Sequence, residues 1–255
     1  LGCGGLMVLP PYVYSTDWRE MKAHVGAVIS ATRLSCMLYN NPVAYRTDFL
    51  PAQVAELAAE HPNLAAVKES SGDVRRIIAL RAALGERLSL LVGMDDAVVE
   101  GVRMGARGWI AGLVNAFPRE SVALFEAAVK GEVARADALY QWFLPLLRMD
   151  CVPKFVQLIK WVQAETGTGG ATVRPPRLPL LRLLLPRRFC QRTSSAWVIR
   201  SVHRSVCSFA TTNSILMAMR WCRGWAHRWQ FWVTRYTACT VPRTSCSHIG
   251  RWSAA

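Results

Sequence analysis

Apolar residues recur along the first 115 positions in two alternating patterns, which predict strands and helices in turn. Short apolar runs predict five strands, at residues 5–10, 34–40, 64–69, 88–93 and 108–113. Segments of helical periodicity lie between them, at residues 17–31, 51–61, 73–84 and 95–104, and each opens on an acidic capping residue or a proline. Strand spacings of roughly 20 to 30 residues are typical of parallel βα units in a barrel or a doubly wound sheet.

The pattern becomes wholly helical after residue 115. Three further helices are predicted, at residues 118–131, 133–149 and 152–166. A glycine-rich loop and a proline-rich segment follow, and the composition then changes abruptly. The predicted organisation is therefore an α/β part at residues 1–115, a helical domain at 116–180 and a tail at 181–255.

The tail carries most of the formal net charge of +14. Residues 187–255 hold 11 Arg, six of the ten Trp and five of the eight Cys, with no Lys, Asp or Glu, so the other 186 residues are nearly neutral. Arginine with aromatic residues can bind nucleic acid. Selected basic surfaces normally mix charge signs and use Lys, however, so a non-native reading-frame product is the favoured interpretation and nucleic-acid binding is the weaker alternative.

The bulk composition favours a globular protein, because 52% of residues are hydrophobic and 19% are charged. Three scattered cysteines precede the tail (Cys3, Cys36 and Cys151), and we expect them to be reduced core thiols in a cytoplasmic protein. The longest apolar run is too short to span a membrane. The chain opens without a basic leader followed by an apolar core, so we expect no signal peptide. It opens on Leu1 rather than on Met, from which we expect a fragment.

Lys68 ends a short apolar strand, directly before an acidic turn that contains glycine. Alternation along a strand places Leu64, Ala66 and Lys68 on one face. It likewise places Ser35, Met37 and Tyr39 together on one face of their own strand. Both strands thus end in a reactive polar group at the carboxyl edge, where α/β barrels hold their active sites. A lysine among apolar neighbours there can act as a nucleophile and form a Schiff base. The alternative is a lysine that merely leaves the core where the strand ends.

Five motifs together resemble the dihydrodipicolinate synthase and N-acetylneuraminate lyase family. In chain order they read "LMVLPPY", "MLYNNP", "AVKESSGD", "GMDDA" and "GARGWIAGLVNAFP", and the resemblance covers about residues 1–180. It implies a (β/α)8 TIM barrel followed by a C-terminal helical domain, commonly assembled as a homotetramer. It also implies that Lys68 is the Schiff-base lysine and that Tyr39 relays protons, with no separate cofactor and no metal.

The resemblance also implies substrate-binding residues. Ile110 matches the position whose backbone faces a bound keto acid. Tyr12 or Tyr14 matches a tyrosine that reaches a neighbouring subunit's site in the synthases. In those synthases an arginine five residues after the catalytic tyrosine binds a substrate carboxylate, but Ala44 stands there in this chain and Arg46 lies two residues beyond. Arg46 is therefore the candidate carboxylate ligand, and the departure argues against a lysine-pathway synthase.

The runs "LYNNPVAYR", "GWIAGLVNAFPRESV" and "VRPPRLPL" are more similar to the branch that deaminates and dehydrates 1-pyrroline-4-hydroxy-2-carboxylate to 2,5-dioxopentanoate. A 4-hydroxy-tetrahydrodipicolinate synthase or another pyruvate-type aldolase is the alternative. Family members begin roughly three βα units before Leu1, so we expect an incomplete barrel of about five units. An open parallel edge leaves backbone groups unpaired, which makes an inactive remnant the third alternative.

Other polar residues are expected to serve structure. Adjacent Asp95 and Asp96 lack a nearby His, so helix capping and loop hydrogen bonds are favoured over a metal pair. Ser70 and Ser71 are expected in a turn rather than as nucleophiles. Two arginines, Arg75 and Arg76, are expected on a solvated helix face.

Overall fold

Parallel strands form the centre of the protein in a computed structural model, which describes residues 2–11, 17–180 and 220–221. Neighbours along the chain are also neighbours in the sheet. The strands are β1 (Gly5–Val8), β2 (Ser35–Asn40), β3 (Leu64–Glu69), β4 (Ser89–Val92) and β5 (Gly108–Trp109). A two-residue strand, β6 (Arg220–Trp221), pairs antiparallel with β5. Five parallel strands in sequential order confirm the predicted βα arrangement.

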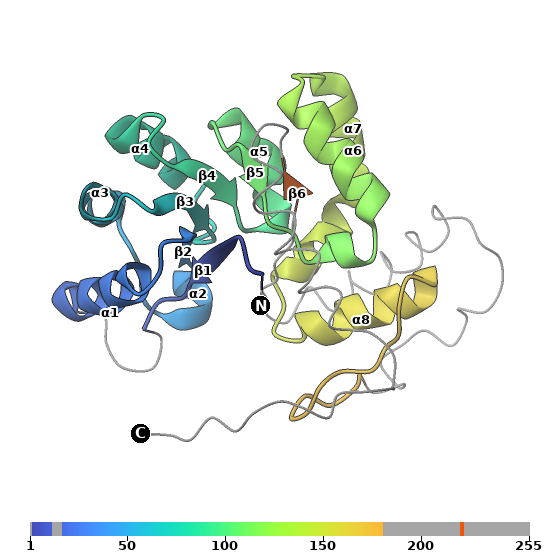
Figure 1. The fold of residues 1–255 in the computed structure, drawn as a ribbon. Helices are drawn as coiled ribbons and strands as arrows, with labels where there is room; N and C mark the ends of the chain where they lie inside the picture. The colour runs from blue at the N-terminus through green and yellow to red at the C-terminus, as the bar shows by residue number, and fades with distance from the viewer. Residues whose placement is uncertain (1, 12–16, 181–219, 222–255) are drawn as a thin grey trace.

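Helices follow the strands in alternation and lie in an arc on the outer side of the sheet (Figure 1). They are α1 (Trp18–Ser30), α3 (Pro51–Glu60), α4 (Arg75–Leu84) and α5 (Val98–Arg103), and a short α2 (Pro42–Tyr45) follows β2 directly. Local sequence explains where they begin. The Asp17 side chain accepts a hydrogen bond from the Arg19 backbone at the start of α1, and Pro51 occupies the first turn of α3.

The main apolar core lies between the sheet and these helices. It contains Leu38 and Val67 from the strands, packed with helix residues such as Val25, Leu57 and Leu80. A second, smaller cluster lies on the opposite face of the sheet and comprises Met37, Ala66, Leu91 and Ile110, with Met7 beside it. Alternate strand residues thus serve two different cores, as the strand periodicity predicts. We call the face with the smaller cluster the inner face.

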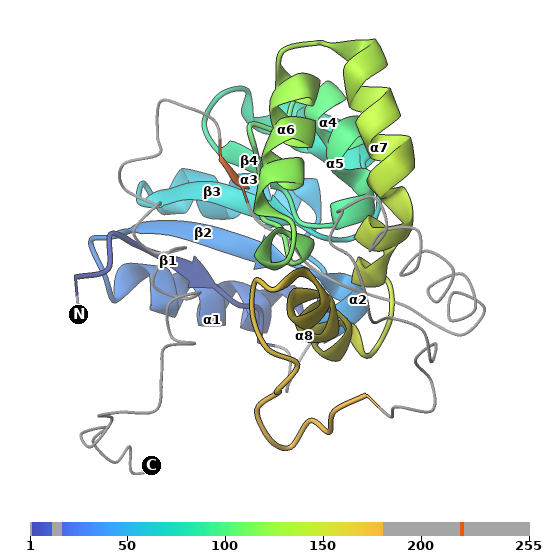
Figure 2. The ribbon, with the colours of Figure 1, turned by 90° about the vertical axis from the view of Figure 1, so that its right-hand side faces the viewer.

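The helical segments after residue 115 match the sequence prediction. They are α6 (Pro118–Val129), α7 (Val133–Leu147) and α8 (Phe155–Thr166), and α6 and α7 run side by side (Figure 2). Apolar residues of all three belong to the same core cluster as the strand residues Leu38 and Val67. The helices therefore stabilise the α/β part by shared burial rather than forming a separate core.

Three elements differ from the prediction, and one of them is β6, which was not expected. The strand expected at residues 108–113 has only two residues, because the chain turns into a short 3-10 helix at Leu113–Asn115. The helix α2 was not expected. Its N-cap is Asn41, Pro42 follows in the first turn, and Arg46 ends it in the left-handed conformation with φ of 59°.

Cysteine placement corrects one expectation, since Cys36 is buried but Cys3 is exposed. Within the described ranges, every helix is too short or too polar to be a candidate membrane span. Apart from Arg220 and Trp221, the tail beyond residue 180 lies outside the described residues, and so do Tyr12 and Tyr14.

Candidate active site

The carboxyl ends of β2 and β3 bring Lys68 and Tyr39 together. The strand register pairs these two residues directly, and the Lys68 Nζ atom lies 4.2 Å from the centre of the Tyr39 ring. Both side chains are buried, with exposed fractions of 2% and 1%. An ammonium group over an aromatic face is attracted by the ring quadrupole. The strand therefore ends with its amine buried against a tyrosine, and the lysine does not simply leave the core at this point.

Apolar side chains line the inner face behind this pair. Met37 and Ala66 precede Tyr39 and Lys68 by two residues on the same faces of their strands, and Leu91 is the register partner of Lys68. Ile110 packs in the same cluster, while its backbone N–H donates to the Val92 carbonyl at 2.9 Å. Lys68, Tyr39 and Ile110, which were named from three separate motifs, thus share one face of the sheet.

Arg46 lies in a different environment. It is exposed, and its backbone N–H donates to the Pro42 carbonyl at the end of α2. The Lys68 amine, by contrast, is buried. The proposed contact between Arg46 and a substrate carboxylate stays a prediction, as does any role of Tyr12 or Tyr14, which lie outside the described residues.

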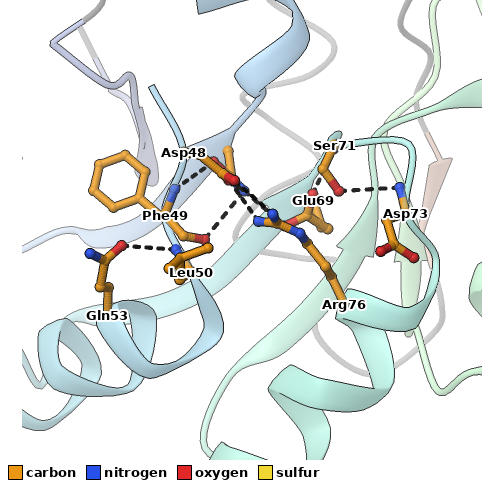
Figure 3. A network of polar contacts seen from close by, with 9 residues as sticks. Asp48, Phe49, Leu50, Gln53, Glu69, Ser71, Asp73 and Arg76 are labelled. Carbon is orange, nitrogen blue, oxygen red and sulfur yellow. Dashed lines mark hydrogen bonds and ion pairs between the residues drawn. The ribbon is translucent and has the colours of Figure 1, made fainter. Parts of the chain in front are cut away.

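A polar network ties the ends of β2 and β3 together on the outer face (Figure 3). The Asn40 amide nitrogen donates to Glu69 Oε2 at 3.0 Å and to Asp48 Oδ1 at 3.1 Å, and its oxygen accepts from the Phe49 backbone. Arg76 binds both oxygens of Asp48 at 2.6 Å. The prediction of a solvated helix face is therefore wrong for Arg76, which is only partly exposed. Arg75 is exposed, as predicted. The local sequence pattern did not show this, because Asp48, the ion-pair partner of Arg76, lies in a loop distant along the chain.

The carboxyl group of Glu69 is almost completely buried in this network. Burial raises its pKa above the ordinary value, although hydrogen bonds from Asn40 and Ser71 act in the opposite direction. The Ser71 backbone N–H donates to Glu69 Oε1 at 2.6 Å, and the Ser71 hydroxyl accepts from the Asp73 backbone, which places Ser71 in the predicted turn. The network holds the strand ends that carry Tyr39 and Lys68.

Asp95 is completely buried at the start of a short 3-10 helix, Asp95–Ala97, which follows β4. Its two oxygens accept hydrogen bonds from the Trp109 indole at 3.3 Å and the Leu113 backbone N–H at 3.2 Å. Burial raises its pKa well above the ordinary value, and neighbouring Asp96 adds to the rise while Lys68 acts against it. The expected loop hydrogen bond is present, but no side-chain cap is formed at this helix end.

The described residues contain no group of three His, Cys, Asp or Glu side chains that could hold a metal ion. Ser70 is buried, and its hydroxyl has no hydrogen-bond partner within residues 2–11 and 17–180. It lies against Gly93, whose backbone N–H donates to the Glu69 carbonyl at 2.8 Å. Among the described residues, the reactive groups identified on the inner face are therefore the Lys68 amine and the Tyr39 phenol.

Sequence reasoning missed Asn41 as a neighbour of Tyr39. The Asn41 amide nitrogen donates to the Tyr39 hydroxyl at 2.9 Å. Tyr45 also contacts Tyr39, with ring centres 5.7 Å apart and planes at 87°. The signal in the sequence was Asn followed by Pro, which is typical of a helix start, but a helix of only four residues gives no periodicity.

The family model described as the dihydrodipicolinate synthetase family matches residues 1–183, which is well over half of the chain. The chain belongs to this family. Curated members of the dihydrodipicolinate synthetase family are similar in sequence over the same part. A 4-hydroxy-tetrahydrodipicolinate synthase from an Exiguobacterium species is 34% identical over 181 residues, which cover 71% of this chain and 60% of the relative. A protein of Pyrobaculum islandicum named as an uncharacterized DapA-like lyase is 34% identical over 187 residues, covering 71% of this chain and 62% of the relative.

Solved structures of dihydrodipicolinate synthetase family members share the fold. The 4-hydroxy-tetrahydrodipicolinate synthase of Methylacidiphilum fumariolicum matches with a TM-score of 0.67 at 24% identity, covering 82% of this chain and 66% of that chain. This likeness identifies the parallel sheet with its outer helices as part of a (β/α)8 barrel. The chain spans about 60% of the length of the curated relatives that it matches.

Proposed function

We propose that the protein is a Schiff-base-forming lyase that acts on a 2-oxo acid or a cyclic imine carboxylate. The observation that supports this most directly is the buried Lys68 amine, 4.2 Å from the centre of the Tyr39 ring at the carboxyl edge of the sheet. Burial disfavours the charged form of an amine, which makes a nucleophilic lysine available without a separate cofactor. A phenol beside it can move protons to and from the bound substrate.

The substrate we propose is 1-pyrroline-4-hydroxy-2-carboxylate. Lys68 adds to C2 of the ring imine, and the ring nitrogen leaves C2 as an amine, which opens the ring. Tyr39 then takes a proton from C3 while hydroxide leaves C4 and is released as water, which leaves a C3=C4 double bond. A proton is lost from C5 and one is gained at C3, which moves the double bond to C4=C5, and this enamine becomes the C5 imine when C4 gains a proton and the nitrogen loses one. Hydrolysis of the imines at C5 and C2 consumes two waters and releases ammonia and 2,5-dioxopentanoate. The net reaction takes up one water and releases one ammonia.

Ala44 supports this substrate over a synthase reaction. It occupies the position at which the synthases are expected to carry a carboxylate-binding arginine, and here its backbone N–H donates to Asn41. The second candidate is 4-hydroxy-tetrahydrodipicolinate synthase, or another pyruvate-type aldolase, because relatives at 34% and 32% identity carry the synthase name. Arg46, Ile110 and Tyr12 remain the proposed substrate-binding residues in either case.

The proposal also covers organisation. We place the part of the barrel that holds the site at residues 1–115, a helical domain that packs on the same core at residues 116–180, and a tail outside the family fold at residues 181–255. The family match to residues 1–183 supports the last boundary. A homo-oligomer, a tetramer by the resemblance, is the proposed assembly, with a small-molecule substrate and no nucleic-acid or membrane partner.

Borohydride trapping tests the proposed function. The purified chain is incubated with pyruvate or with the pyrroline, reduced, digested and mapped by mass spectrometry. We expect one reduced adduct on Lys68, lost in Lys68→Met and retained in Lys130→Met, which removes an amine from an exposed lysine. Ammonia release from the pyrroline, without an aldol product from pyruvate and an aldehyde, favours the deaminase over the synthase. Absence of any adduct on the wild-type chain overturns the lyase proposal and favours the inactive remnant.

A further inference from the structure

Asn41 forms two side-chain hydrogen bonds in opposite directions. Its Oδ1 accepts from the Ala44 backbone N–H at 2.9 Å, which caps α2, and its Nδ2 donates to the Tyr39 hydroxyl at 2.9 Å. The residue is buried, with an exposed fraction of 1%. The Ala44 bond defines the orientation of the amide, because a backbone N–H can only be accepted by the oxygen. The nitrogen must therefore face Tyr39.

This orientation determines how the Tyr39 hydroxyl is used. A phenol has one proton to donate, and an oxygen that accepts from Asn41 directs that proton to a different acceptor. After the proton has left, the Asn41 N–H remains a donor to the phenolate, and hydrogen bonds to a charged group are stronger than those to a neutral one. Asn41 thus favours the form of Tyr39 that can take a proton from a substrate.

Other capping residues would not provide this contact. Ser, Asp and Asn all cap helices well, since each offers a side-chain oxygen to the backbone. Only the Asn amide adds a donor on the far side of the same group. Aspartate would place a second acceptor against the Tyr39 oxygen, and serine is too short to extend beyond the cap. The requirement for Asn at position 41 therefore comes from Tyr39 and not from α2.

We propose that Asn41 is a positioning residue for proton transfer by Tyr39, which holds the hydroxyl as an acceptor and stabilises its phenolate. The inference rests on the proposed Schiff-base function. In the reaction used to test it, the Lys68 amine condenses with the C2 carbonyl of pyruvate, the Tyr39 hydroxyl gives its proton to the departing hydroxide, and water, a protonated imine and the Tyr39 phenolate are formed. The Tyr39 phenolate takes a proton from C3, the C–H electron pair becomes the C2–C3 double bond, and the imine electron pair returns to nitrogen. In D2O, return of a deuteron labels the methyl group.

Three titratable groups act at or near Tyr39 in the described part of the chain. Lys68 from β3 faces the ring, Tyr45 from α2 contacts it edge to face, and Asp95 acts electrostatically on Lys68. All three are identical in the wild type and in variants at position 41. A difference between their pH profiles therefore reports the changed contact between residue 41 and Tyr39.

The experiment compares wild type, Asn41→Ser and Asn41→Asp, which all retain a capping oxygen for α2. Deuterium incorporation into the pyruvate methyl group is followed by NMR against pH, and endpoint borohydride trapping and thermal unfolding are measured on the same samples. We expect wild-type trapping and nearly wild-type unfolding in both variants, with exchange slowed by about tenfold to a hundredfold. In Asn41→Asp the acid limb of the profile moves to higher pH, because a carboxylate opposes the phenolate.

The outcomes separate the two proposals. Absence of an adduct on wild-type Lys68 overturns the proposed function and this inference with it. A wild-type adduct, together with exchange rates and pH profiles that are unchanged in both variants, overturns the role of Asn41 alone. Equal slowing in the two variants with an unshifted profile also overturns it, because a purely structural loss does not depend on the charge at residue 41.

Discussion

Asn40 and Glu69 join the ends of two neighbouring strands through a 3.0 Å hydrogen bond on the outer face of the sheet. Each residue lies one position beyond a candidate catalytic side chain, Tyr39 or Lys68, which points to the inner face. Because successive strand residues alternate between faces, a contact that fixes the outer pair also fixes the spacing of the inner pair. The outer network is therefore the support for the geometry of the candidate active site.

The first prediction concerns the pH dependence of stability through Glu69. Its pKa is raised in the folded protein by burial, so the folded state binds a proton more readily than the unfolded state. The stability this provides is present below the ordinary pKa near 4.5 and is lost as the pH rises through the folded value. In Glu69→Gln the residue no longer titrates. We expect wild type to lose stability relative to Glu69→Gln as the pH rises from about 4.5 towards neutral.

Urea unfolding at several pH values measures this difference. Asp95 and Asp96 also have raised pKa values, but both residues are present in wild type and in Glu69→Gln. Their contributions to the pH dependence of stability therefore cancel in the comparison. Glu86→Gln is the control, since Glu86 is exposed. Parallel pH curves for wild type and Glu69→Gln would contradict the prediction.

The second prediction concerns the ion pair between Asp48 and Arg76. Their side chains are only 33% and 20% exposed, and the contact is bidentate. In a double-mutant cycle with Asp48→Asn and Arg76→Gln, we expect a coupling free energy of about 1 kcal/mol. The neighbouring pair, Asp73 and Arg75, has a similar geometry but is more exposed. Its coupling is expected to lie within experimental error, and equal coupling for the two pairs would show that burial does not matter.

The third prediction concerns the Tyr39 hydroxyl. Tyr39→Phe keeps the ring under Lys68 but removes the group that moves protons. We expect the pyruvate adduct on Lys68 to form, while deuterium exchange into the methyl group falls by about 10² to 10⁴. Tyr140→Phe is a matched control on α7, because it also removes a tyrosine hydroxyl. That hydroxyl is partly buried and donates to Glu100 Oε2 at 2.9 Å. Wild-type exchange in Tyr39→Phe would exclude the relay role.

Strand alternation was sufficient to predict the inner face of the site. It placed Lys68 with Ala66 and Tyr39 with Met37, and the register between β2 and β3 pairs Met37 with Ala66 and Tyr39 with Lys68. Leu64 was expected on the same face as Lys68 but belongs to the main core, where the register of the two strands shifts. Periodicity carries this information because each strand buries two different faces. The function of these residues was not available from periodicity and came from the motifs.

Contacts between distant segments could not be predicted in the same way. Arg76 pairs with Asp48, 28 residues away, so its local pattern resembled that of any solvated helix face. The strand expected to continue to residue 113 stops early because the Leu113 backbone donates to Asp95 instead of to a neighbouring strand. Each of these features is determined by tertiary structure rather than by local propensity.

The last prediction concerns the close approach of Gly93 to Ser70, two residues beyond Lys68. A Cβ atom on Gly93 would lie 1.7 Å from the Ser70 Oγ and 3.0 Å from the Glu69 carbonyl oxygen. Gly93→Ala therefore forces the end of β3 to move, and we expect a loss of about 1 to 3 kcal/mol in unfolding free energy.

Ser70→Gly removes the nearest clashing atoms but leaves the Glu69 backbone contact, so the double variant with Gly93→Ala should recover only part of the loss. Thermal unfolding of the two single variants and the double variant measures the coupling. A Gly93→Ala penalty that is the same in both backgrounds would mean that the backbone contact, and not the serine side chain, requires glycine here.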